Sequence, residues 1–260
     1  MRREATDAVR RGGAGGRGGQ SGERRNGSKP AGSGSGGSRN AKRRRQRTRK
    51  RVEDALEIDR DRLVRRLGTA KADRALARFA DATQAFSEDR LEDARSQLKP
   101  VVDLLPDEPA VRELHGLTLY RLGRWRQAVT ELEAFADRTG STDQHPVLAD
   151  CHRAMGHHRK VAELWEDLGA ASPDAATIAE GRIVYAGSLA DRGDLAAAIK
   201  VLEAGSLGSK DLKDHHLRMR YALGDLYDRA GEHQAARRQF EAVARQVPDF
   251  FDVRERLDHL

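Results

Sequence analysis

Cysteine is almost absent from this 260-residue sequence, since Cys151 is the only one. One cysteine cannot form an internal disulfide, and a zinc site built on several cysteines is also excluded. Long apolar runs are missing too, because no stretch approaches the roughly 18 consecutive apolar residues that a membrane-spanning helix needs. Arg2 and Arg3 are not followed by the apolar stretch of a secretory signal peptide. These absences predict a cytoplasmic protein without a membrane span.

Acidic residues are scarce in the first 51 residues, and aromatic residues are absent until Phe79. Residues 1–51 contain fourteen Arg and three Lys but only three acidic residues, which gives this segment a net charge of +14. The remaining 31 basic and 38 acidic residues give residues 52–260 a net charge of −7. This difference in net charge predicts a basic arm that binds a polyanion and is attached to a mildly acidic body.

The arm lacks the apolar side chains that a packed core needs. Residues 1–41 hold twelve of the 25 glycines, and burial in such a segment cannot offset a conformational entropy cost of roughly 1–2 kcal/mol per residue. We therefore expect residues 1–51 to be disordered. The two Arg-Gly-Gly triplets at 11–13 and 17–19 are typical of disordered RNA binders, in which Arg stacks on unpaired bases.

The densest basic run is KRRRQRTRKR at 42–51, with eight positive charges in ten positions. Binding to RNA or the ribosome through this run is driven by counterion release and has low sequence specificity. The run has other interpretations: a solubilising tail, contact with an acidic protein or anionic membrane, or contact with the acidic body of the same chain. The residues expected to neutralise phosphates are Arg43, Arg44, Arg45, Arg47, Arg49, Lys50 and Arg51.

From about Val52 the pattern becomes helical, and residues 52–68 read as one helix that ends at Gly68. Farther along, one short pattern recurs. In LGDLYDRAGEHQAARRQF, residues 223–240, a Gly231 turn follows a helix and Ala236 stands five residues later. Equivalent turns fall at 89, 123, 156, 193 and 231, which are 34, 33, 37 and 38 residues apart. Because the third and fourth intervals exceed the period, we expect longer loops near 171–177 and 205–213.

The body resembles tetratricopeptide repeats, which are helix–turn–helix units with a period near 34 residues. This resemblance implies an all-α solenoid of about five hairpins over 69–248, with a capping helix at 249–260. Two helices approach closely only where the contact residues are small, so small residues should lie at each helix crossing. An irregular helical bundle is the alternative fold. The expected crossing residues are Ala82, Gly116, Ala149, Ala186 and Gly224 on first helices, with Ala94, Ala128, Ala198 and Ala236 on second helices.

The resemblance also implies a concave groove, lined by the first helix of each hairpin, that binds a protein or peptide. Tyr120 and Tyr221 are the expected anchors, because aromatic residues and Arg dominate interface hot spots. Phe79, Thr83 and Leu114 replace Lys and Asn of the subgroup that clamps a peptide's terminal carboxylate, so that function is not expected. The residues predicted to line the groove are Tyr120, Arg121, Asp150, Arg153, Arg218, Tyr221, Asp225 and Asp228.

No nucleophile constellation, phosphate-binding glycine loop or paired-carboxylate motif is visible in the sequence, which predicts a protein that is not an enzyme and has no cofactor. A zinc site needs three or four converging ligands. His152, His157 and His158 do not share a helix face, so we expect solvent-facing histidines and no metal. The sequence thus predicts a scaffold with a basic arm that tethers it to RNA. The alternative is a pure protein-interaction adaptor with an inert arm, and the sequence leaves the oligomeric state open.

Overall fold

A computed structural model describes residues 58–208 and 211–260. The predictions for the basic arm, including Arg43–Arg51, and for residues 52–57 of the predicted N-terminal helix lie outside the described residues. The two described ranges contain helices and no strand. In chain order the helices are α3 (Arg60–Leu67), α4 (Thr69–Ser87), α5 (Leu91–Leu104), α6 (Pro109–Arg121), α7 (Trp125–Thr139), α8 (His145–Ala154), α9 (His158–Ala171), α10 (Ala175–Asp191), α11 (Leu195–Glu203), α12 (Asp214–Arg229), α13 (His233–Ala244) and α14 (Val253–His259).

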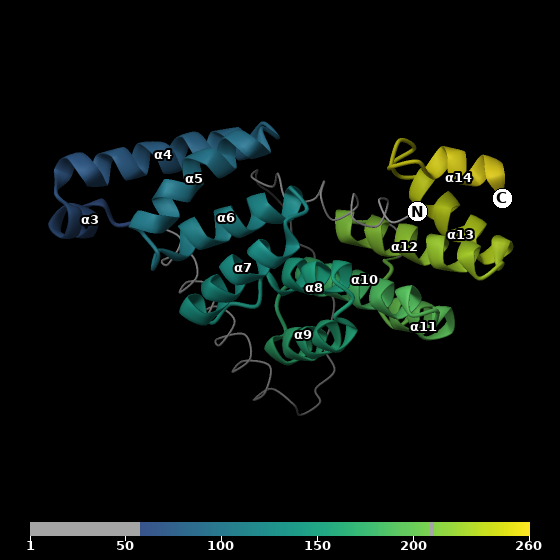
Figure 1. Ribbon diagram of the computed structural model, residues 1–260. Coiled ribbons are helices and arrows are strands. Elements are labelled where there is room, and N and C mark those ends of the chain that lie inside the picture. The colour runs from purple at the N-terminus through teal and green to yellow at the C-terminus, as the bar shows by residue number, and fades with distance from the viewer. Residues whose placement is uncertain (1–57, 209–210) are drawn as a thin grey trace, which may run out of the picture.

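Five helical hairpins make up the described body: α4–α5, α6–α7, α8–α9, α10–α11 and α12–α13. Each hairpin packs mainly on its neighbours in the sequence. Figure 1 shows the stack as an arch, with α6, α8, α10 and α12 along its inner side and α7, α9, α11 and α13 outside them. The predicted all-α solenoid is therefore confirmed, and the irregular bundle is not what the chain forms.

The turn inside each hairpin has one geometry. After α6, Gly123 adopts a φ of 73°, and the Arg124 amide donates to the Leu119 carbonyl at 2.9 Å. This αL residue satisfies carbonyls at the end of the helix and reverses the chain, a role for which glycine is best suited. In the first hairpin Asp89 takes the same place with a φ of 61°. Aspartate tolerates that conformation better than most residues with a side chain.

The small residues predicted at the helix crossings are buried. Ala82, Ala94, Ala128, Ala198 and Ala236 are fully enclosed. Ala149 and Ala186 are nearly so. A Cβ atom at Gly116 would lie 2.7 Å from Leu132 side-chain atoms, and one at Gly224 would lie 2.8 Å from the Phe240 ring. These contacts explain why a small residue recurs at the crossing position of every first helix, whereas the equivalent second-helix position in the third hairpin is the buried Val161.

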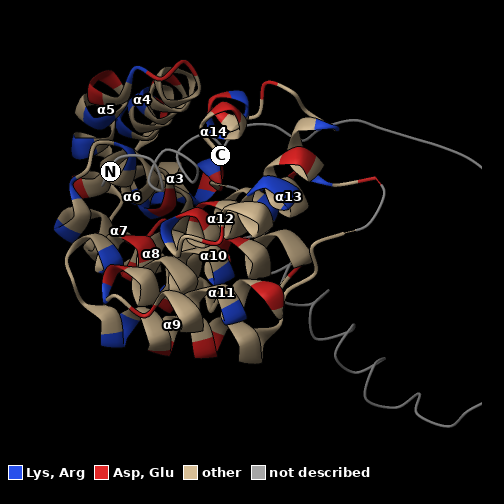
Figure 2. Ribbon diagram, turned by 90° about the vertical axis from the view of Figure 1, so that its right-hand side faces the viewer, with Lys and Arg blue, Asp and Glu red and all other residues tan. Residues whose placement is uncertain are grey.

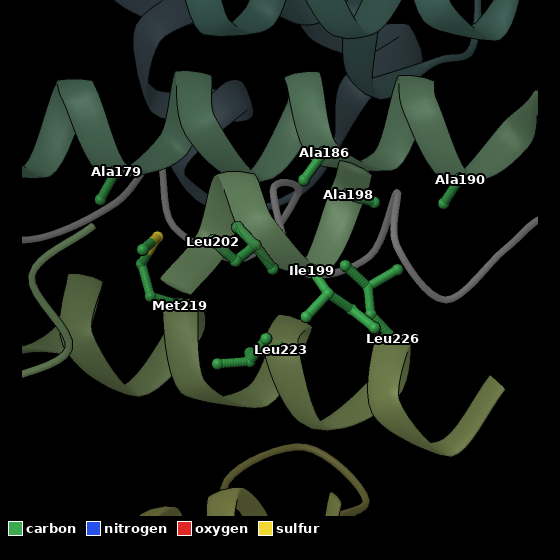
Figure 3. Packing of buried hydrophobic residues seen from close by; sticks show 9 residues of the cluster. All are labelled: Ala179, Ala186, Ala190, Ala198, Ile199, Leu202, Met219, Leu223 and Leu226. Atoms are coloured by element: carbon green, nitrogen blue, oxygen red, sulfur yellow. The ribbon is translucent and has the colours of Figure 1, made fainter. Parts of the chain in front are cut away.

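The core runs between hairpins and has no single centre. Figure 3 shows one of its clusters, in which Ala179, Ala186 and Ala190 of α10 face Ala198, Ile199 and Leu202 of α11 and Met219, Leu223 and Leu226 of α12. Each hairpin alone would leave one apolar face exposed to water. Stacking therefore provides the burial that keeps the hairpins folded.

The longer loop expected near 171–177 is not present. Only Ser172, Pro173 and Asp174 separate α9 from α10, because the Asp174 side chain accepts the amides of Ala176 and Thr177 and starts α10 at once. The additional residues instead lengthen α10, which has 17 residues where α8 has 10. The connection expected near 205–213 does lie between two helices, since α11 ends at Glu203 and α12 begins at Asp214, with residues 209–210 outside the described ranges.

The ends of the stack differ from the expected boundaries. The first described helix begins at Arg60, because Asp59 is extended and caps it by accepting the Arg62 amide at 3.0 Å. Gly68 ends this helix as predicted. An Arg62–Glu108 ion pair at 2.6 Å fastens α3 to the connection between α5 and α6. At the other end α14 begins at Val253, a buried residue, rather than at 249.

Candidate protein-binding face

The inner side of the arch carries the eight residues predicted to bind a partner. They lie on the first helices α6, α8 and α12, as expected. Figure 2 shows Lys and Arg mixed with Asp and Glu along these helices. Most of these charges pair with side chains of the same or a neighbouring hairpin.

A chain of polar contacts joins three consecutive first helices. The Tyr120 hydroxyl of α6 donates to Asp150 Oδ2 of α8 at 2.7 Å. Arg153 Nε, one turn farther along α8, donates to Asp150 Oδ1 at 2.8 Å. Its Nη1 atom then donates to Asp191 Oδ2 at the end of α10, also at 2.8 Å. Three hairpins are thereby connected through four side chains.

Burial governs the protonation of this chain. Tyr120 is 2% exposed and Asp150 is 1% exposed. Burial, followed by the charge of Asp150, raises the pKa of Tyr120 well above its ordinary value. Burial alone would lower the pKa of Arg153, but Asp150 and Asp191 hold it above its usual range. The tyrosine thus stays a neutral donor and the arginine stays a cation.

A second contact joins α10 to α12. Arg218 is buried, and its Nη1 atom donates to Glu180 Oε1 at 2.6 Å. Its Nε atom lies 3.2 Å from Asp214, one turn earlier on α12. Burial raises the pKa of Glu180 despite the opposing charge of Arg218. Like Tyr120 and Asp150, Arg218 connects helices.

The residues predicted on the last hairpin contact the C-terminal segment. The Tyr221 hydroxyl donates to Asp252, just before α14. Arg256 Nη2 donates to Asp225 at 2.8 Å and to Asp228 at 3.2 Å. Burial first, and then the bond to Asp252, raises the pKa of Tyr221. Helix α14 therefore covers the end of the inner face.

The first hairpins are joined in the same way. Arg121 Nη2 donates to Asp89 at 2.6 Å, and its guanidinium lies 4.7 Å from the centre of the Phe86 ring. Gln144 Nε2 donates to Glu113 at 2.7 Å, which connects the start of α8 to α6.

Three residues that were predicted to line an accessible groove are in fact buried. Tyr120, Asp150 and Arg218 are buried between first helices, so Tyr120 does not offer an exposed aromatic anchor. Helical spacing identifies which residues turn inward, but it does not show that the next hairpin covers them. Arg121, Arg153, Tyr221, Asp225 and Asp228 keep part of their surface exposed. The sequence analysis missed Arg256 and Asp252, although their spacing from Asp225 and Tyr221 is close to one repeat.

Carboxylates at the edge of the inner helices remain accessible. The Asp214 side chain is 73% exposed and that of Asp191 is 41% exposed. Arg229, at the end of α12, is also exposed, at 3.8 Å from Asp225. We use the name rim for these exposed groups, which lie beside the buried contacts. A partner bound along the inner side of the arch would contact them.

The histidines do not all face solvent, contrary to expectation. His152 is buried on α8, and its Nδ1 atom lies 3.3 Å from Nδ1 of His157 in the following turn. Burial lowers the pKa of His152, and the nearby charges of His157 and Lys160 lower it further. His158 Nδ1 lies 2.8 Å from the Ser188 hydroxyl of α10. Within 58–208 and 211–260, no three His, Cys, Asp or Glu residues gather as metal ligands.

None of the described helices is both long enough and apolar enough to span a bilayer.

Comparison with known proteins identifies the fold. No protein-family profile and no curated protein sequence matches the chain. The crystal structure of TTC0263, a thermophilic TPR protein of Thermus thermophilus, is similar with a TM-score of 0.55 at 18% identity, over 71% of this chain and 97% of that one. The TPR domain of P58(IPK) gives a TM-score of 0.36 at 12% identity, over 83% of this chain and 74% of that one. With its five hairpins and its close crossings at small residues, this chain has the tetratricopeptide-repeat fold.

Proposed function

We propose that this protein is a non-enzymatic scaffold that holds a segment of a partner protein along its inner face. The observation that carries the proposal is the arch itself, whose inner face is made by the consecutive first helices α6, α8, α10 and α12 (Figure 1). The contacts between hairpins keep that surface ordered before a partner arrives, which reduces the entropic cost of binding. Asp191 and Asp214 are accessible at its rim, so the partner segment should present basic or hydrogen-bond-donating side chains to these two carboxylates.

The test compares inner and outer charges of the same kind. The full-length chain is used to capture binding proteins from its own cells, beside an Asp191→Lys, Asp214→Lys variant. Glu133→Lys, Glu166→Lys is the matched control, because both glutamates are exposed on the second helices α7 and α9. The proposal expects a protein that the wild type and the control retain and the inner variant loses. A protein lost equally from both variants, or from neither, contradicts binding at the inner face.

The basic segment 42–51 supplies a second function, which is a tether to RNA or the ribosome. The +14 net charge of residues 1–51 beside a body of −7 favours this role over an inert arm. A titration of single-stranded RNA compares the full chain with a chain that lacks residues 1–51. About six phosphate contacts predict a slope of log K against log salt near −4. An unchanged affinity on truncation would leave the pure adaptor as the function.

A further inference from the structure

Three cations on α4 have no partner within the described part of the chain. Lys71, Arg74 and Arg78 are exposed, and their side chains make no ion pair or hydrogen bond. Two arginines of α3 are paired, since Arg60 bonds to Asp73 and Arg62 to Glu108.

A comparison between hairpins makes Arg78 unusual. It stands four residues before the small crossing residue Ala82, and arginine occupies the same place in three other hairpins. There Arg112 bonds to Glu131, Arg182 to the Val201 carbonyl, and Arg220 to the Leu207 carbonyl. In those hairpins the guanidinium bonds within its own hairpin or to the connection that precedes it, whereas Arg78 has no such bond to any residue of 58–208 or 211–260.

The three cations form a row on one side of the helix. Their spacing of three and then four residues places them within about 60° of one another around α4, at about 100° per residue. With a rise of 1.5 Å per residue, the row is about 10 Å long. A single strand with stacked bases advances about as much per phosphate as one strand of a duplex, roughly 3.4 Å along its axis, so the same length holds about three phosphates.

The surroundings of the row favour a nucleic acid over other anionic partners. The exposed residues beside it on α4 are the small Ala70 and Ala77 and the carboxylate of Asp81, which leaves the row with an excess of positive charge. A helix that lies in a membrane surface needs an apolar face opposite its charges, and a protein interface needs an apolar or aromatic centre. Among the described residues, Val247 is the one large hydrophobic side chain that is exposed, and it follows α13 near the other end of the chain.

We infer that Lys71, Arg74 and Arg78 of α4 contact consecutive phosphates of single-stranded RNA. This inference rests on the proposed RNA tether. The row lies close to that segment in the chain, since 19 residues separate Arg51 from Lys71. The row adds three charges at the fixed spacing of a helix.

The experiment removes the row from the full-length chain with Lys71→Gln, Arg74→Gln, Arg78→Gln. The control, Arg126→Gln, Arg192→Gln, Lys200→Gln, removes the same charge from three exposed positions on later hairpins. Binding of a mixed-sequence single-stranded RNA is titrated at several salt concentrations. Three lost phosphate contacts make the salt slope about 2 less steep and weaken binding about 100-fold at 0.1 M salt. Circular dichroism and melting confirm that both variants remain folded.

The outcomes separate this inference from the tether on which it rests. A larger loss of affinity and slope in the row variant than in the control supports the row. Equal behaviour of the two variants, with RNA binding that is lost on removal of residues 1–51, overturns the row and leaves the tether intact. No RNA binding by the wild-type chain overturns both. Binding to phosphatidylserine vesicles in place of RNA also overturns both.

Discussion

The hydrogen bond from Tyr120 to Asp150 gives a sharp test of how the hairpins are coupled. Tyr120→Phe removes one hydroxyl and keeps the ring. Asp150 is 1% exposed, so Oδ2 would lose its donor without gaining water. Leaving a buried acceptor unsatisfied costs about 1–3 kcal/mol, and a charged acceptor belongs at the upper end of that range. Arg153 still neutralises the carboxylate through its bond to Oδ1.

Tyr227→Phe is the matched control. Its hydroxyl also donates to a carboxylate, that of Glu203, but the pair lies at the surface where water replaces the lost donor. We expect a cost below about 1 kcal/mol there. Urea unfolding followed by circular dichroism gives both free energies of unfolding. Equal losses for the two variants would refute the argument that Tyr120 joins α6 to α8 through a buried bond.

Two further predictions concern packing and pH. Gly224→Leu and Ala236→Leu should each lower the free energy of unfolding by about 1–3 kcal/mol through overpacking, whereas Arg44→Ala should leave the melting temperature unchanged; similar shifts in all three would contradict the assigned register. Because folding raises the pKa of Tyr120 above its unfolded value of about 10, its stability contribution is complete below pH 10 and declines at higher pH, by up to about 1.4 kcal/mol per pH unit. The free energy of unfolding, measured by urea titration at several pH values from 8 to 11, should therefore fall less steeply above pH 10 in Tyr120→Phe than in the wild type.

The recurring pattern of turn and crossing residues could be predicted because it depends on interactions within each hairpin. Gly123 and Gly231 mark turns that need a positive φ, and Ala128 and Ala236 mark close crossings. Each of these signals lies within one hairpin, so a single sequence is enough to reveal it. The longer loop predicted near 171–177 does not form because the Asp174 cap starts α10 at Ala175, so the extra residues are helical.

The inner face was harder to predict because accessibility depends on the next hairpin. Periodicity places Tyr120 and Asp150 on the inner side of their helices. Only the arrangement of neighbouring hairpins shows that the two side chains bury each other. A usable signal was present, since the contacts of Tyr120, Arg121 and Asp225 join residues 30 to 32 positions apart, close to the repeat period.

The difference in burial between the connecting contacts and the rim charges has a practical consequence for handling the protein. Salt screens exposed charges strongly and buried pairs much less. Moderate ionic strength should therefore elute a partner or RNA from Asp214 or Lys71, while the bond between Tyr120 and Asp150 keeps the hairpins together. Washing an affinity column with salt would recover the scaffold folded and free of its cargo.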